Sequence, residues 1–107
     1  MNNEKSIFPQ IVTNDEIKEK LDNKRIKLVD VREEHEYVLQ HIPSSIFLPL
    51  SELETRYTEL DKDDEIYVIC RTGNRSDMAM RFLQSKGFKK VANVLPGMIE
   101  WDGPVQP

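Results

Sequence analysis

The stretch Tyr67-Val68-Ile69-Cys70-Arg71-Thr72-Gly73-Asn74-Arg75-Ser76 joins a β-branched apolar run to a polar loop that contains a glycine. The run, which starts at Ile66, is typical of a buried strand, and Cys70 stands at its end. Ser76 is a favourable N-cap for a following helix, and Gly87 is placed to close that helix in a left-handed conformation. The apolar stripe of this helix consists of Ala79, Phe82 and Leu83. The stretch therefore predicts a unit of strand, loop and helix, with the only cysteine at the start of the loop.

Strand-like and helix-like segments alternate on both sides of this unit. Thr13-Asn14-Asp15-Glu16 and Ser51-Glu52-Leu53-Glu54 both have the pattern of a capping box, which predicts a helix over about 14–22 and another that opens at 51. A further short helix fits Glu33 to Leu39. Strands are expected at residues 26–31, 45–48, 66–69 and 91–94. This alternation predicts an α/β fold with a parallel sheet, in which ligands bind beyond the carboxyl ends of the strands.

Length and composition bound the possible functions. The chain has 107 residues, which is enough for one domain, and its 38% hydrophobic and 32% charged residues are typical of a globular protein. No apolar run approaches the roughly 18 residues needed to cross a bilayer, and the first residues lack a signal peptide pattern. We therefore expect a cytoplasmic protein that has no membrane partner. A net charge of -4 argues against nucleic acid as a partner.

Cys70 is the single cysteine, so an internal disulfide is excluded and a reducing compartment is expected. The charge around it is uneven, because residues 70–90 include six basic residues and one acidic residue. Such a local positive field attracts small anions and favours the thiolate over the thiol. This distribution indicates a small anionic substrate.

The loop after Cys70 has the composition of an anion-binding nest. If it curls around the sulfur, its backbone N–H groups point inward, and Gly73 supplies the positive φ angle that such a curl requires, which Asn74 also tolerates. The positive end of the following helix, together with Arg71 and Arg75, would lower the thiol pKa from its free value of about 8.5 toward neutrality. The alternatives are a small buried hydrophobe at a strand end for Cys70, and solvated surface charge for the two arginines.

These residues closely resemble the active-site half of the rhodanese family of sulfurtransferases. Further motifs of that family are Leu28-Val29-Asp30-Val31-Arg32, Tyr37, His41-Ile42-Pro43, Gly87-Phe88 and Trp101, so the resemblance runs from about Ile11 to Trp101. Gln40 and Ser44-Ser45 depart from the glycines that the family often has around the His-Ile-Pro motif, and Gly97-Met98 replaces a late Gly-Gly pair. The resemblance implies a single rhodanese-like domain over 1–107, with its core at about 11–101. It also implies a five-stranded, mainly parallel sheet flanked by helices on both faces.

The resemblance implies a sulfurtransferase that moves sulfane sulfur through a Cys70 persulfide. The donor would be a small anion such as thiosulfate, and the acceptor would be cyanide or the thiol of a protein or small molecule. Cys70 is the expected catalytic residue, and no metal or cofactor is required. The expected substrate-binding residues are Arg71, Thr72, Gly73, Asn74, Arg75 and Ser76. A persulfide carrier or partner-docking module without efficient free turnover is the alternative.

The length of the loop separates sulfur transfer from phosphate chemistry. Phosphatases and arsenate reductases with rhodanese-like folds have five residues between cysteine and arginine, whereas four separate Cys70 from Arg75 here. The smaller ring suits a sulfane sulfur, and a phosphate needs a larger ring with an arginine that faces it. We therefore rank phosphate hydrolysis and arsenate reduction below sulfur transfer. Asp30 and Arg32 are interpreted as structural, with Arg32 paired to a nearby acid.

Overall fold

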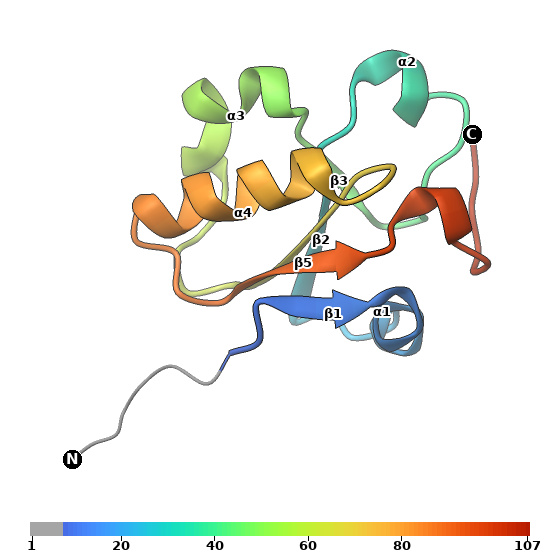
Figure 1. Ribbon diagram of the computed structural model, residues 1–107, viewed down its shortest axis with the longest axis horizontal. Coiled ribbons are helices and arrows are strands. Elements are labelled where there is room, and N and C mark those ends of the chain that lie inside the picture. Colours follow the sequence, from blue (N-terminus) through green and yellow to red (C-terminus); the bar gives the residue numbers. More distant parts are fainter. Residues whose placement is uncertain (1–7) are drawn as a thin grey trace.

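A computed structural model of the protein describes residues 8–107, which build one five-stranded sheet (Figure 1). All of the strand pairs in this part of the chain are parallel, and the strand order is β1-β5-β4-β2-β3. The strands are β1 (Ile11–Thr13), β2 (Ile26–Asp30), β3 (Ile46–Phe47), β4 (Glu65–Ile69) and β5 (Val91–Leu95). The α/β fold expected from the sequence is confirmed, and the sheet has helices on both faces.

Each face of the sheet carries its own hydrophobic core. Helices α3 (Leu50–Arg56) and α4 (Asn74–Ser85) cover one face, and α1 (Asn14–Lys20) covers the other (Figure 1). Side chains alternate along the central strand β4, so that Ile66 and Val68 pack toward α4 while Tyr67 and Ile69 pack toward α1. The remaining short elements are α2 (Glu34–Tyr37), η1 (Tyr57–Glu59) and η2 (Met98–Glu100). No helix within residues 8–107 is long and apolar enough to cross a membrane.

The first predicted capping box is confirmed, because the Thr13 hydroxyl accepts a hydrogen bond from the Glu16 amide and the Glu16 carboxylate accepts one from the Thr13 amide. The second is wrong. Helix α3 begins at Leu50 after Pro49, and the Ser51 hydroxyl donates to Glu33 at 2.7 Å instead of capping the helix. Proline sets an extended backbone at the N-cap position, so the N-cap is Pro49, two residues before the serine that the capping box indicated.

Two other local predictions need correction. The helix expected over 33–39 is shorter, since α2 spans Glu34–Tyr37 only. Strand β1 was not identified from the residue pattern, because its three residues are too few to show a period. It forms by pairing with β5 from Ile11↔Asn93 to Thr13↔Leu95. In contrast, Gly87 closes α4 with a φ of 95°, as predicted.

Candidate functional site

Cys70 follows the last residue of β4, at the carboxyl edge of the parallel sheet. The neighbouring strands end at the same edge, so Arg32 after β2 and Gly97 after β5 lie beside the loop that Cys70 begins. The Cys70 backbone is tied down there, because its carbonyl accepts a hydrogen bond from the Met98 amide at 2.9 Å. The Arg71 carbonyl accepts one from the Ile99 amide at 3.0 Å. These bonds hold the first two carbonyls of the loop on its outer side.

The loop curls around the sulfur, and its amides point inward. The Gly73 amide donates to Cys70 Sγ at 3.1 Å and the Ser76 amide donates at 3.3 Å. The Ser76 hydroxyl oxygen lies 3.2 Å from the same sulfur. Gly73 adopts a φ of 97°, which is the left-handed conformation that the loop was predicted to require. The expected nest of backbone N–H groups is therefore present around Cys70.

The protein environment favours the thiolate of Cys70. Burial of the thiol, which is 1% exposed, raises its pKa. Hydrogen bonds from the Ser76 side chain and from the amides of Ser76, Gly73 and Thr72 lower the pKa by more, so the net pKa lies below the ordinary value of a thiol. Because the folded state has the lower pKa, ionisation of Cys70 stabilises the fold above the unfolded-state pKa. That contribution is lost as the pH falls through the folded-state pKa.

Alkylation of Cys70 by iodoacetamide is expected to have a midpoint below the free-thiol pKa of about 8.5, because only the thiolate reacts. The measurement is the rate of mass gain at a series of pH values. The same chain unfolded in denaturant is the matched control, since unfolding removes the ring of amides and should return the midpoint to that of a free thiol. A folded protein that reacts only at alkaline pH would contradict an activated thiolate.

Ser76 has a different place from the one predicted. Helix α4 begins at Asn74 after Gly73 as N-cap, so Ser76 lies inside the first turn and does not cap the helix. The left-handed Gly73 redirects the chain early, and Asn74 is therefore helical and exposed. The Ser76 side chain is fully buried and turns toward Cys70, where it forms part of the ring.

The two arginines of the loop have different surroundings. Both terminal nitrogens of Arg75 donate to the carboxylate of Glu36 on α2, at 2.7 and 2.9 Å. The Arg75 hydrogen bond lowers the pKa of Glu36 to about 2, so the pair stays charged at neutral pH. Arg71 is exposed, forms no ion pair with any residue of the described chain, and borders a cavity of about 230 Å³. Thr72 is also exposed, and its amide is directed to Cys70.

Two asparagines that the sequence analysis did not single out support the loop. Asn14, at the start of α1, donates to the Gly97 carbonyl at 2.9 Å and accepts from the Gly97 amide at 3.1 Å. Asn93 on β5 accepts from the Ser76 hydroxyl and donates to the Gly73 carbonyl at 3.1 Å. Both side chains are buried. The polar Asn93 within the apolar run Val91–Leu95 is a sequence signal that could have identified it, whereas Asn14 lies among polar residues and has no such signal.

The prediction that Arg32 pairs with a nearby acid is confirmed, and that acid is Asp30. Arg32 donates through two nitrogens to the buried carboxylate of Asp30, at 2.9 to 3.2 Å, and also to the Gln40 carbonyl at 2.8 Å. No three His, Cys, Asp or Glu side chains within residues 8–107 are grouped as a metal site would require.

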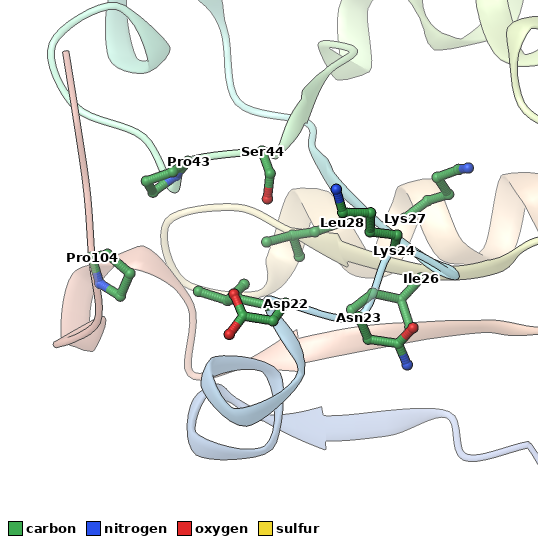
Figure 2. A pocket seen from close by; sticks show the side chains of 10 residues that line it. Asp22, Asn23, Lys24, Ile26, Lys27, Leu28, Pro43, Ser44 and Pro104 are labelled. Carbon is green, nitrogen blue, oxygen red and sulfur yellow. The ribbon is translucent and has the colours of Figure 1, made fainter.

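A larger cavity, of about 630 Å³, lies away from Cys70 (Figure 2). It is formed where α1 leads into β2, with Pro43, Ser44 and Pro104 on its other sides. None of the predicted site residues lines it. The volume of a cavity therefore does not identify the site in this protein. The thiol of Cys70 and the amides around it identify the Cys70 loop as the candidate site.

A thiol held by inward backbone amides between a parallel strand and a helix defines a class of proteins with an ionised cysteine and an anion-binding loop. The Rhodanese-like domain model matches residues 13–103 of this chain. The chain belongs to the rhodanese-like domain family, whose matched relatives are named as sulfurtransferases and sulfur carriers. The resemblance found in the sequence is confirmed.

Individual relatives support the same assignment. YrkF of Bacillus subtilis, whose name proposes a sulfur carrier, is 49% identical over 80% of this chain. YtwF of the same organism, whose name proposes a sulfurtransferase, is 37% identical over 85% of this chain and 88% of its own length. A crystal structure of a rhodanese-related protein from Thermoplasma volcanium has a TM-score of 0.82 and 32% identity, and the match covers 91% of this chain and 97% of that one. The chain spans about half the length of YrkF, 47%.

Proposed function

We propose that the protein is a sulfurtransferase that moves sulfane sulfur from a small anionic donor, such as thiosulfate, through a persulfide on Cys70. The observation that carries this proposal is the ring around the sulfur. Two backbone amides and a hydroxyl lie 3.1 to 3.3 Å from Cys70 Sγ. A preorganised ring of donors stabilises negative charge on a thiolate and on a sulfur bonded to it, as an oxyanion hole does for oxygen.

In the first step, the Cys70 thiolate attacks the outer sulfur of thiosulfate. A bond forms between Sγ and that sulfur, the bond to the sulfonate group breaks, and its electron pair leaves with sulfite. The product is a Cys70 persulfide that carries the negative charge on its outer sulfur. The Gly73 and Ser76 amides, which donate to Sγ, lie next to the sulfur that carries this charge, and Arg71, which forms no ion pair with the described residues, attracts the donor.

In the second step, cyanide or an acceptor thiolate attacks the outer sulfur. The bond between the two sulfurs breaks, its electron pair returns to Cys70 Sγ, and thiocyanate or a new persulfide leaves. The hydrogen bonds that lower the pKa of the Cys70 thiol favour the thiolate, which is the form that acts as nucleophile. A thiol acceptor, small or on a protein, is abundant in a reducing compartment such as the cytoplasm, which also suits a mechanism that depends on a free thiol.

Phosphate hydrolysis and arsenate reduction rank below sulfur transfer for a geometric reason. Those reactions require an arginine that faces the anion with both of its terminal nitrogens. Both terminal nitrogens of Arg75 are bound to Glu36. Six residues after Cys70, where the longer motif has its arginine, this chain has Ser76. Robust hydrolysis of an aryl phosphate that depends on Cys70 would reverse this ranking.

A persulfide carrier is the second candidate. It is favoured by the 49% identity to YrkF, whose name proposes a sulfur carrier and which extends beyond the matched region. A carrier would hold the same Cys70 persulfide but release it only to a partner. Both candidates use the same first step, so the second step must distinguish them.

The test is the intact mass of the protein before and after thiosulfate, followed by addition of cyanide. We expect a gain of one sulfur atom on Cys70, loss of that sulfur with cyanide, and repeated turnover to thiocyanate. Gain of sulfur without turnover would identify a carrier. No gain of sulfur from thiosulfate would exclude thiosulfate as the donor and leave the first step without support.

Arg71→Gln is expected to raise the KM for thiosulfate about tenfold at low ionic strength, with a smaller effect on kcat, because Arg71 acts on the approaching anion. Arg25→Gln is the matched control. It removes the same charge from an exposed arginine just before β2, at the opposite edge of the sheet from Cys70. Equal effects of the two variants on KM would show that only net charge matters.

A further inference from the structure

A buried polar side chain lies directly beneath the Cys70 loop. Asn93 on β5 is 3% exposed, and its two polar ends have separate partners. Its Oδ1 accepts from the Ser76 hydroxyl at 2.5 Å, and its Nδ2 donates to the Gly73 carbonyl at 3.1 Å. The second contact fixes the orientation of the carboxamide, because the reversed orientation would set two acceptor oxygens against each other.

The Ser76 hydroxyl has one proton but two neighbours that need it. Asn93 Oδ1, at 2.5 Å, has no proton and can act only as an acceptor. Cys70 Sγ, at 3.2 Å, is likewise solely an acceptor when it is a thiolate. When Cys70 is a neutral thiol, its S–H donates to the Ser76 oxygen and the hydroxyl donates to Asn93. When Cys70 is a thiolate, the hydroxyl is drawn to the sulfur and Asn93 Oδ1 loses its donor in a buried position.

We propose that Asn93 is a positioning residue that competes with the Cys70 sulfur for the single proton of the Ser76 hydroxyl, and so sets which form of the sulfur the ring favours. The proposal deepens the proposed function, since it concerns the thiolate which that function requires. Leaving an acceptor buried without a donor costs free energy, so Asn93 opposes ionisation while the members of the ring favour it.

The competition gives the hydroxyl a different orientation at each stage of sulfur transfer. In the persulfide, Sγ is bonded to the second sulfur and the charge lies on that outer atom, so the hydroxyl turns to Asn93. When the acceptor removes the outer sulfur, the electron pair of the broken bond returns to Sγ. The hydroxyl then turns to Sγ and stabilises the leaving thiolate. The hydroxyl only rotates, and no proton leaves the protein.

The charged groups near Cys70 stay the same in both orientations. Arg71, in the loop itself, is exposed and forms no ion pair with the described residues. From α4, Arg75 acts on the sulfur through its charge, and it is paired with Glu36 of α2. Asp30, the last residue of β2, is paired with Arg32, which follows that strand. Asn93, the side chain of β5 that binds the Ser76 hydroxyl, is neutral. A change in Cys70 ionisation that follows substitution of Asn93 therefore reports on the hydroxyl or on the Gly73 carbonyl that Asn93 also binds, and Ser76→Ala separates the two.

The test is Asn93→Leu, which removes both polar ends and keeps the same number and branching of side-chain heavy atoms. We expect the pH midpoint of Cys70 alkylation to fall by about one unit, a tenfold change in the ionisation constant, because the hydroxyl is then free to donate to Sγ. Ser76→Ala is expected to raise the midpoint, and adding Asn93→Leu to Ser76→Ala should change it no further. A residue that only supports the loop would raise the midpoint or leave it unchanged when lost, and either result for Asn93→Leu overturns the proposal.

A measurement on the unaltered protein keeps the proposal testable if Asn93→Leu does not fold. The side-chain amide resonances of Asn93 in an NMR titration should shift with the same midpoint as Cys70 alkylation, and the shift should disappear in Ser76→Ala. Resonances that do not respond to Cys70 ionisation would overturn the proposal. Neither measurement uses a sulfur donor, so a failure of sulfur transfer is distinguishable from a failure of this proposal.

Discussion

Replacing Cys70 by serine is expected to lower sulfur transfer from thiosulfate to cyanide by about a thousandfold or more. A serine hydroxyl is not ionised at neutral pH, and the ring of hydrogen-bond donors around position 70 cannot supply the nucleophile that the sulfur provides. The measurement is thiocyanate formation together with the intact mass after thiosulfate, which should show no gain of sulfur.

The fold should tolerate this change, so that lost activity can be assigned to chemistry. The serine oxygen keeps the Gly73 and Ser76 amides as partners, and we expect the free energy of unfolding to change by about 1 kcal/mol or less. The unaltered protein alkylated at Cys70 is the chemical control, and it should be equally inactive. Full turnover by folded Cys70→Ser would exclude the persulfide mechanism.

The parts of the site that lie close together in the sequence could be predicted. An apolar run, a cysteine and a glycine within one short stretch are enough to indicate the strand, the curled loop and the following helix. Gly73 does have the positive φ that the curl requires, and the loop amides do face the sulfur. These features depend on the backbone conformations that neighbouring residues allow, and those conformations can be inferred from a short stretch of sequence.

The supports of the loop could not be predicted, because they depend on pairing between distant segments. Asn14 meets Gly97 across 83 residues, and Glu36 meets Arg75 across 39. No pattern within either segment indicates its partner. The prediction that Ser76 caps the helix is wrong for a related reason. A serine before an apolar stripe is typical of an N-cap, but α4 begins early, after Gly73, so that Ser76 lies inside its first turn.

The strand β1 shows the same limit at the level of the fold. Three residues cannot display an alternation that distinguishes a strand from a loop. The segment is a strand because its backbone pairs with that of β5. The family resemblance implied five strands where the residue pattern indicated four. The fifth strand therefore came from comparison with known proteins and not from periodicity.

Gly97→Ala is expected to lower the free energy of unfolding by about 3 kcal/mol, because the position combines a strained conformation with two close contacts. Gly97 has a φ of 104° and a ψ of -165°, a region that residues with a side chain rarely adopt. A Cβ atom there would lie 2.6 Å from the Cys70 carbonyl oxygen and 2.7 Å from that of Arg71. Both oxygens belong to the backbone of the loop and cannot move without it.

Gly87→Ala is the matched control, since it shares the positive φ but lacks the backbone contact. Gly87 has a φ of 95°, and the nearest neighbour of its added Cβ would be the flexible end of Lys62 at 3.3 Å. We expect a loss of about 1 kcal/mol from conformational strain alone. Chemical denaturation of the two variants measures the difference. An equal decrease in the free energy of unfolding in both variants would show that the close approach of Gly97 to the loop carbonyls does not add to the cost of a side chain there.

The same substitution should also disturb the chemistry in the fraction that folds. The amides of Met98 and Ile99 donate to the Cys70 and Arg71 carbonyls, and this contact keeps the loop amides directed at the sulfur. Moving those carbonyls away from Gly97 rotates the peptide planes and weakens the hydrogen bonds to Sγ. We therefore expect the alkylation midpoint of Cys70 to rise in Gly97→Ala and to stay unchanged in Gly87→Ala. A lower stability with an unchanged midpoint would show that Gly97 supports the fold but not the thiolate.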